Sequence, residues 1–234
     1  MVLKQRISMS SLLGAASWVA ACASTPHPAT TGAQGAAQPK AESPQNVDQV
    51  KSALVGDWVS IAPEVRPSAA KNADGTPKPF YLKRDFTYLE GDRFELTVMN
   101  SADPNGAVPL AKISIKGHMT WRGQHPIAAG AQKVDFVADE AYQVTPAIQG
   151  FVDILNKVAK DGYDPWVLDG TQSIFGKTFV PFGLVAGKNF TEFDLVYVSH
   201  DMLFWGARNV DGRGFDKEEN RPTNLQIPLV RKSR

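Results

Sequence analysis

The sequence predicts a mainly β protein, an antiparallel barrel or half-barrel with one amphipathic helix. Three observations support this prediction. Much of the chain after residue 46 alternates apolar and polar side chains with a period of two, as a strand with one buried face does. Turn signals separate these short segments, as in antiparallel β proteins. A single longer segment repeats its apolar residues at helical spacing instead.

The first strands follow a short helix. Apolar residues within 47–54 are three and four residues apart, which predicts a short helix leading into a strand over 57–61. Residues 80–89 and 93–98 alternate on either side of the turn Glu90-Gly91-Asp92, which predicts a hairpin with one wet and one apolar face. Further strands are expected over six segments: 110–121, 132–138, 170–180, 190–198, 202–208 and 226–232.

One segment, 146–160, predicts the amphipathic helix. Thr145 is an N-cap candidate, Pro146 suits the first helical position, and Gly162 follows as a stop signal. The opposite face lacks the Lys and Arg excess of a membrane-surface helix, so we expect the apolar stripe to pack on the sheet. The stripe consists of Ile148, Phe151, Val152, Leu155, Val158 and Ala159.

Residues 1–21 have the pattern of a signal peptide. Lys4 and Arg6 precede an apolar stretch that is too short to span a membrane stably. It ends in Val19-Ala20-Ala21-Cys22, which resembles the lipobox of bacterial lipoproteins. The resemblance implies cleavage before Cys22 and attachment of acyl chains such as palmitate to this cysteine. The alternative is an ordinary secretory signal with Cys22 left as an unpaired thiol.

The lipoprotein resemblance also implies a location. Ala23 rather than Asp follows Cys22, which in Gram-negative lipoproteins favours export to the outer membrane. We therefore expect a lipid-anchored protein of the bacterial cell envelope, at the periplasmic face of the outer membrane. Residues 22–45 are rich in Ala, Thr, Pro, Gly and Gln and predict a disordered tether with a reach of roughly 25–30 Å. Residues 46–234 have the length and apolar content of one domain.

Composition argues against several functions. Outside the leader the chain has 23 basic and 24 acidic residues, without the basic excess typical of nucleic-acid binding. Cys22 is the only cysteine. The four histidines lack metal-ligand spacing, and there is no Gly-x-Ser-x-Gly elbow and no phosphate-binding glycine loop. We therefore expect no metal, no cofactor and no catalytic residues.

The stretch Gly56-Asp57-Trp58 carries a more specific signal. Gly-x-Trp in the first strand, after a short helical turn, resembles lipocalins and their relatives. A barrel needs a plug at its closed end, and an Arg from the last strands can stack on the face of such a Trp. The resemblance implies this role for Trp58, with Arg208 as its expected partner.

A wider resemblance covers both ends of the domain. Glu64-Val65-Arg66-Pro67, followed by the basic and aromatic segment 80–86, resembles the adenomatosis polyposis coli down-regulated (APCDD) domain family, whose domains are lipocalin-like. The segments 203–208, 211–213, 221–225 and 228–231 follow the closing pattern of the family in order. Animal members inhibit Wnt, a lipidated signal, and no Wnt role is carried over to a bacterial lipoprotein.

The chain departs from this family in its cysteines. Pro63 stands where the family has a Cys, and no later cysteine is present. Ser68 replaces the Gly that commonly follows the Pro of Glu-Val-Arg-Pro. The disulfides of the family are therefore absent, and we expect looser loops at the barrel mouth.

The apolar strand faces are the expected binding surface. Glu64 and Arg66 would lie at the mouth, either as a contact for a polar headgroup or as a rim salt bridge that contributes little. Sequence alone does not separate a hollow barrel from a filled one. The candidate lining residues are Phe94, Ile113, Ile115, Met119, Trp121, Phe136, Phe193 and Trp205.

Two functions remain open. In the first, the protein holds a hydrophobic or amphipathic ligand, a lipid or acyl chain, in a barrel cavity without chemistry. In the alternative, a filled barrel acts through protein–protein contacts with an envelope partner. The helix 146–160 and the acidic loop near Asp211 would then be the contact surfaces.

Overall fold

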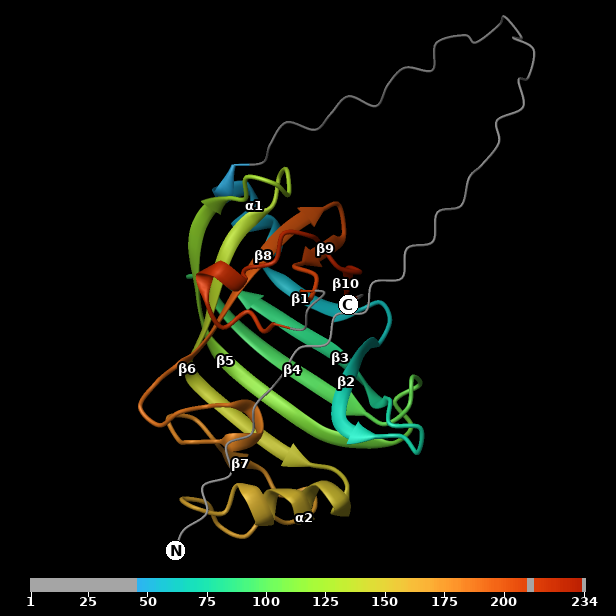
Figure 1. Ribbon diagram of the computed structural model, residues 1–234. Helices are drawn as coiled ribbons and strands as arrows, with labels where there is room; N and C mark the ends of the chain where they lie inside the picture. Colours follow the sequence, from blue (N-terminus) through green and yellow to red (C-terminus); the bar gives the residue numbers. More distant parts are fainter. Residues whose placement is uncertain (1–45, 210–212, 233–234) are drawn as a thin grey trace, which may run out of the picture. The chain divides into compact units, whose positions relative to one another are not determined.

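The computed structural model describes residues 46–209 and 213–232, and this part of the chain is mainly β, as predicted (Figure 1). Its strands form one antiparallel sheet, accompanied by two α-helices and two short 3-10 helices. The elements are α1 (Val47–Leu54), β1 (Gly56–Ser60), β2 (Glu64–Lys71), β3 (Pro77–Leu89), β4 (Arg93–Ser101), β5 (Pro109–Gln124), β6 (Gln132–Pro146), α2 (Gln149–Val158), β7 (Gln172–Ser173), η1 (Val180–Phe182), β8 (Phe190–Ser199), β9 (Met202–Trp205), η2 (Glu218–Asn220) and β10 (Leu229–Arg231).

The predicted signal peptide, Cys22 and the tether lie outside the described residues. So does the Asp211 part of the acidic loop. Within the described residues, neither helix is long and apolar enough to cross a membrane.

The strand pairings return to their starting point. The order is β1-β10-β9-β8-β6-β5-β4-β3, and β1 also pairs with β3. Trp58 is the residue at this junction, since it lies opposite Arg231 of β10 and opposite Phe86 of β3. The hydrogen-bonded pairs therefore form a closed circuit of eight strands. The remaining two strands are attached to it, β2 at β3 and β7 at β6.

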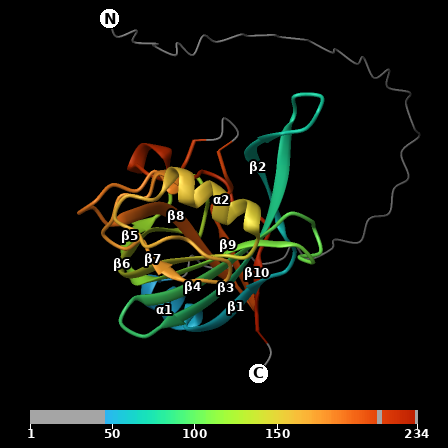
Figure 2. The ribbon, with the colours of Figure 1, turned by 90° about the horizontal axis from the view of Figure 1, so that it is seen from below.

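The strands differ in length, which distinguishes the two ends of the sheet. Strands β3 to β6 have 9 to 16 residues, whereas β1, β9 and β10 have three to five. The short strands lie near α1, and the long strands extend beyond them toward α2 (Figure 1). Figure 2, seen from below, shows α2 in front of the strands. We call the end of the sheet near α1 the α1 end, and the end near α2 the α2 end.

Trp58 fills the α1 end. Its side chain is fully buried, and its indole N–H donates to the carbonyl of Leu54, the last residue of α1, at 2.7 Å. The Arg231 guanidinium lies 4.3 Å from the ring centroid. Gly56 has φ +124°, and a Cβ there would lie 2.9 Å from Arg231 Nη1, so the Gly of Gly-x-Trp leaves room for this arginine.

The arginine over Trp58 is thus Arg231, in the role that the sequence analysis gave to Arg208. Arg231 is fixed there by register, because it lies directly opposite Trp58. Its guanidinium also donates to the carbonyls of Ala53 and Val55, which satisfies oxygens at the C-terminus of α1. Arg208 follows β9, and its charge acts on Arg66 and Glu192.

The second helix is shorter than predicted. Thr145 and Pro146 end β6, because they continue its pairing with Lys112 and Ala111 of β5. Helix α2 begins at Gln149 without a side-chain cap. Val152 and Leu155 are buried as expected, whereas Ile154 and Val158 are exposed.

Three other strand predictions were only partly right. In the segment 170–180, β7 covers only Gln172–Ser173. Phe179, farther along this segment, is buried against the rings of Tyr163 and Phe182 rather than in a strand. Strand β9 ends at Trp205 and β10 begins only at Leu229. Strand β2 was not predicted as a strand, because its sequence combines charged residues with Pro67.

We predict that Trp58→Ala lowers the free energy of unfolding by about 3–5 kcal/mol, because it removes a fully buried indole and its hydrogen bond. Urea unfolding followed by circular dichroism measures the loss. Phe204→Ala is the matched control. Phe204 is partly exposed and packs against Tyr197 in a tilted geometry, so its loss should be about 1 kcal/mol. Equal losses would contradict the role of Trp58.

Candidate functional site

A layer of charged side chains crosses the inner side of the sheet. Cross-strand partners show which way these side chains point. Glu64 lies opposite Leu82, and Glu192 lies opposite Phe136, both buried residues of the core. We call the following residues the charged layer: Glu64 and Arg66 on β2, Arg84 on β3, and Glu192 and Asp194 on β8.

Glu64 joins two arginines. Its carboxylate accepts hydrogen bonds from Arg84 Nε at 3.0 Å and from Arg84 Nη2 at 3.3 Å. Arg66 Nη2 donates to the same carboxylate. The side chain of Glu64 is 5% exposed, and those of Arg66 and Arg84 are 16% and 13% exposed. The predicted pair of Glu64 and Arg66 is therefore present, but it is mostly buried rather than a solvated rim bridge.

The charged layer rests on aromatic rings. The Arg84 guanidinium lies 5.0 Å from the Trp205 ring centroid, in cation–π geometry. Trp205 packs in turn on Phe86 at 4.3 Å and on Phe136 at 4.8 Å. Because every second residue of β3 points inward, Tyr88 and Phe86 precede Arg84 from the α1 end. The α1 end is therefore aromatic, and the charges begin directly beyond it.

Glu192 differs from Glu64. Within the described residues its side chain has no hydrogen bond and no ion pair, although its backbone pairs with β6. Burial raises its pKa, and the positive charges of Arg84, Arg66 and Arg208 oppose this rise. It borders a cavity of about 10 Å³ together with Phe190 and aromatic rings of the core. That volume holds about one water molecule, so the space at Glu192 is nearly filled.

Asp194 lies deeper and is 1% exposed. Its Oδ1 accepts the backbone N–H groups of Leu195 at 2.7 Å and Gly206 at 2.9 Å. A Cβ on residue 206 would lie 2.4 Å from this oxygen, so the contact requires glycine. Burial, and then the charge of Glu192, raise the pKa of Asp194 to about 8. The carboxyl is therefore mostly protonated at neutral pH.

One oxygen of this carboxyl and two polar atoms of neighbouring aromatic side chains are buried without a hydrogen-bond partner. They are Asp194 Oδ2, Tyr88 Oη and Trp205 Nε1. Burial raises the pKa of Tyr88, and the neighbouring Trp205 N–H opposes this rise. Shifted carboxyls in a cleft often mark catalytic sites. Here the cavity that Glu192 borders has a volume of about 10 Å³, which is space for about one water molecule.

An apolar strip leads away from the charged layer toward the α2 end. Tyr142 of β6 lies 6.2 Å from the ring of Phe182 and 6.0 Å from that of Phe190. Phe190 is two residues before Glu192 on β8, so the strip ends at the charged layer. Phe182, Phe190, Leu184 and Val98 are only partly buried. Tyr142, Phe182 and Phe190, which contact one another through Tyr142, are called the apolar strip below.

Most of the predicted lining residues lie in the core. Phe94 packs edge-on against Phe136 at 5.4 Å, and both belong to the aromatic cluster of the α1 end. Six of the eight are buried in one apolar cluster: Phe94, Ile113, Ile115, Met119, Phe136 and Trp205. They therefore fill the interior that they were expected to line.

Trp121 and Phe193 lie elsewhere. Trp121 donates its indole N–H to Asp92 at 2.9 Å and borders an open groove of about 510 Å³ between α1 and the β3–β4 turn. Lys51 bonds the same Asp92 at 2.8 Å, so the polar groups there satisfy one another. Phe193 points away from Glu192 and Asp194, its neighbours on β8, and lies under the Arg221 guanidinium at 5.4 Å.

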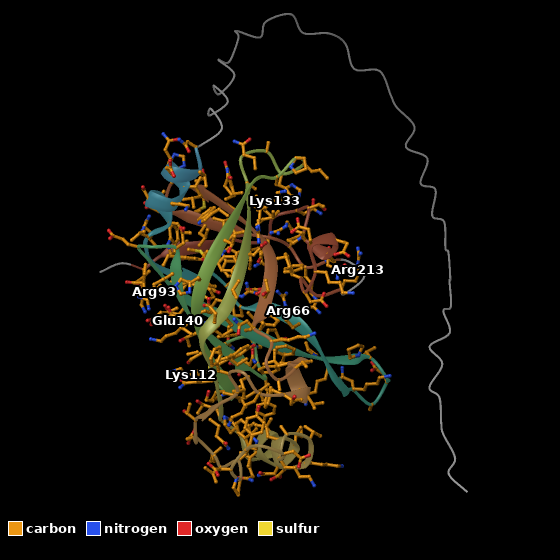
Figure 3. The ribbon with its side chains drawn as sticks, turned by 90° about the vertical axis from the view of Figure 1, so that its left-hand side faces the viewer. Arg66, Arg93, Lys112, Lys133, Glu140 and Arg213 are labelled. Atoms are coloured by element: carbon orange, nitrogen blue, oxygen red, sulfur yellow. The ribbon has the colours of Figure 1, made fainter. Side chains whose placement is uncertain are left out.

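The outer face of the sheet carries paired surface charges. Arg93 donates to Glu140 at 2.9 and 3.0 Å, and Figure 3 shows the two side chains next to each other. His118 bonds Asp139 at 2.9 Å. Exposed pairs of this kind contribute little. Among the described residues, no three His, Cys, Asp or Glu side chains gather as a metal site would require.

Comparison with protein-family models gives no match, and comparison with curated protein sequences gives none. The resemblance to the APCDD family stays a prediction.

We predict that Asp194→Asn alters the pH dependence of stability. Burial raises the pKa of the wild-type carboxyl from its ordinary value of 3.8 to about 8 in the fold, so the folded protein binds this proton more tightly than the unfolded chain does. The carboxyl therefore contributes fully to the free energy of unfolding below about pH 4, and this contribution is lost as the pH rises through about 8. The variant should therefore lose less stability than the wild type over this range. Urea unfolding across pH measures this, and parallel profiles would contradict it.

Proposed function

We propose that this chain is a lipid-anchored binding protein of the bacterial cell envelope that holds a hydrophobic or amphipathic ligand, a lipid or acyl chain, without catalysis. The observation that carries the proposal is the charged layer, set between a filled aromatic core and the partly buried apolar strip. A surface with charges at one end and apolar rings along its length suits a ligand with a polar head and an apolar tail.

We propose further that the closed circuit of strands is a lipocalin-like barrel. The pairing of β1 with both β3 and β10 supports it, as does the buried Trp58 of the Gly-x-Trp segment. The APCDD resemblance agrees, since Glu64 and Arg66 of its Glu-Val-Arg-Pro motif belong to the charged layer.

The ligand would bind on the apolar strip and not in the α1 end. Trp58, Phe86, Trp205 and Phe136 already fill that end, and the cavity at its edge holds about one water molecule. Phe182 and Phe190 keep part of their surface accessible beyond the charged layer. Covering this surface removes apolar area from water, which contributes about 25 cal/mol per Å² before ordering costs.

The sequence of the leader supports the location. Anchoring through Cys22 and the tether of residues 22–45 would hold the domain near the periplasmic face of the outer membrane. At that place the membrane is the natural source of an acyl-chain ligand.

A second function, contact with an envelope protein, is favoured by a different observation. Large apolar side chains between α2 and β8 are exposed: Ile154, Val158, Val167, Leu168, Val180 and Val185. The filled α1 end is also what a barrel without a ligand would have. Exposed apolar surface of this kind marks interaction sites when it is contiguous. Cross-linking in cells that captures one stable partner would favour this function.

We predict that the mature chain carries a stoichiometric amphiphile when it is purified gently from cells, because the apolar strip stays partly exposed without one. Native mass spectrometry with solvent extraction measures it. A clean mass without ligand, and no uptake of fluorescent fatty-acid probes, would contradict the proposal.

We also predict that Phe190→Ala weakens binding of a fluorescent fatty acid about 5- to 30-fold, because it removes one ring of the apolar strip. Fluorescence titration of the mature chain with Cys22→Ser, which prevents acylation, measures the affinity. Phe204→Ala is the control, since Phe204 packs against Tyr197 and lies on the opposite face of β9 from the buried Trp205. Equal weakening by both variants would contradict binding at the strip.

A further inference from the structure

We propose that the polar group of the ligand is an anion, a carboxylate or phosphate, bound by Arg66 and Arg84. This inference rests on the proposed function and adds the chemical class of the ligand. The geometry that carries it is one carboxylate, Glu64, shared by two largely buried guanidinium groups. Two positive charges and one negative charge leave the trio with a net charge of +1.

The two arginines keep donors for a second anion. Each guanidinium has five N–H donors in a planar fork. Arg84 uses Nε and Nη2 on Glu64. Arg66 uses Nη2 on Glu64 and Nη1 on the carbonyl of Val65 at 3.3 Å. The remaining donors suit the oxygens of a carboxylate or phosphate, which such forks bind in paired hydrogen bonds.

Partial burial strengthens the attraction for an anion. Burial lowers the pKa of Arg66 and Glu64 opposes this, so the guanidinium is poorly solvated where it lies. Figure 3 shows Arg66 beside β8, the strand of the apolar strip residue Phe190. In a partly dehydrated site, a charge–charge contact is worth more than at an exposed surface. A ligand anion would therefore compensate the net charge of the trio.

The carboxyls of β8 do not remove this charge. Asp194, with a pKa of about 8, is mostly neutral at pH 7. Burial raises the pKa of Glu192 as well, and the charge of Arg208 acts on both Glu192 and Arg66. Glu192 therefore compensates the two arginines less than a solvent-exposed carboxylate would.

A cationic head is the competing possibility, because Glu192 lies next to aromatic rings and has no ion pair within the described residues. Carboxylates and aromatic faces together can bind quaternary ammonium groups. Here the face of Trp205 already receives Arg84 at 5.0 Å. A second cation would have to displace that guanidinium or lie beside it, and like charges repel.

The experiment compares three ligands with the same twelve-carbon tail: dodecanoate, dodecanol and dodecyltrimethylammonium. Each displaces the uncharged probe 1-N-phenylnaphthylamine from the mature chain carrying Cys22→Ser at neutral pH. The two ionic ligands are kept below their critical micelle concentrations, and dodecanol is kept below its solubility limit. We expect dodecanoate to bind about 10- to 100-fold more tightly than dodecanol, the effect of a charge-assisted hydrogen-bond pair. Dodecyltrimethylammonium should bind most weakly.

Two variants that change the net charge of the trio in opposite directions separate a role in anion recognition from a role in folding. Arg66→Gln takes the trio to zero net charge and leaves Glu64 paired with Arg84, so the preference for dodecanoate over dodecanol should fall to within about twofold. Glu64→Gln takes the trio to +2 and should increase that preference. A purely structural role would weaken all ligands alike in both variants. Lys83→Gln is the control, because Lys83 is exposed on the opposite face of β3 and changes the total charge equally.

The outcomes separate the two proposals. Equal binding of all three ligands, or tightest binding of dodecyltrimethylammonium, would overturn the anion site and leave the binding function standing. Failure of all three ligands to displace the probe would overturn the binding function together with the anion site. Lower affinity in Arg66→Gln with an unchanged preference for dodecanoate would also overturn the anion site.

Discussion

The carboxylate of Glu64 is the contact on which the arrangement of the interior depends. It compensates Arg66 and Arg84, two guanidinium groups that would otherwise be buried charges without an ion pair. It also ties β2, which lies outside the closed circuit, to the inner side of β3. With Arg84 held in this way, its guanidinium covers Trp205 and completes the aromatic core beneath it. If the proposed function is right, fold stability and ligand recognition both depend on this side chain.

The interior divides into two parts with different properties. At the α1 end, Trp58 and the rings around Phe86 are buried. Arg231 covers the ring of Trp58 and donates to a carbonyl at the C-terminus of α1. This packing supplies a rigid end in a chain whose single cysteine precludes an internal disulfide. Toward the α2 end, Phe182 and Phe190 are only partly buried. A ligand would therefore meet a fixed base and a more accessible apolar surface, with charges between them.

Sequence was sufficient where structure is local. The hairpin around Glu90-Gly91-Asp92 and helix α1 follow from alternation, turn residues and helical spacing. The partner of Trp58 was wrong because it depends on the register between β1 and β10, strands at opposite ends of the domain. Thr145 and Pro146 fit a helix start, but pairing with β5 keeps them in a strand. Tertiary pairing decided both cases.

Sequence analysis identified only two residues of the charged layer. Glu64 and Arg66 were recognised through a family resemblance, and their burial was not foreseen. Arg84, Glu192 and Asp194 left a weaker signal: each is a charged residue at a position where its strand otherwise places an apolar one. The sequence analysis did not single out these breaks in alternation, which mark charges directed into the core. Their convergence depends on strand pairings between distant segments, which alternation does not specify.

A crystal structure of the protein with bound dodecanoate tests the central claim most directly. The account predicts the ligand carboxylate within hydrogen-bond distance of Arg66 and Arg84, with its tail along Tyr142, Phe182 and Phe190. Glu64 would keep its contact with Arg84, and the α1 end would stay filled. A ligand in the groove between α1 and the β3–β4 turn, or a carboxylate directed away from the two arginines, would contradict it.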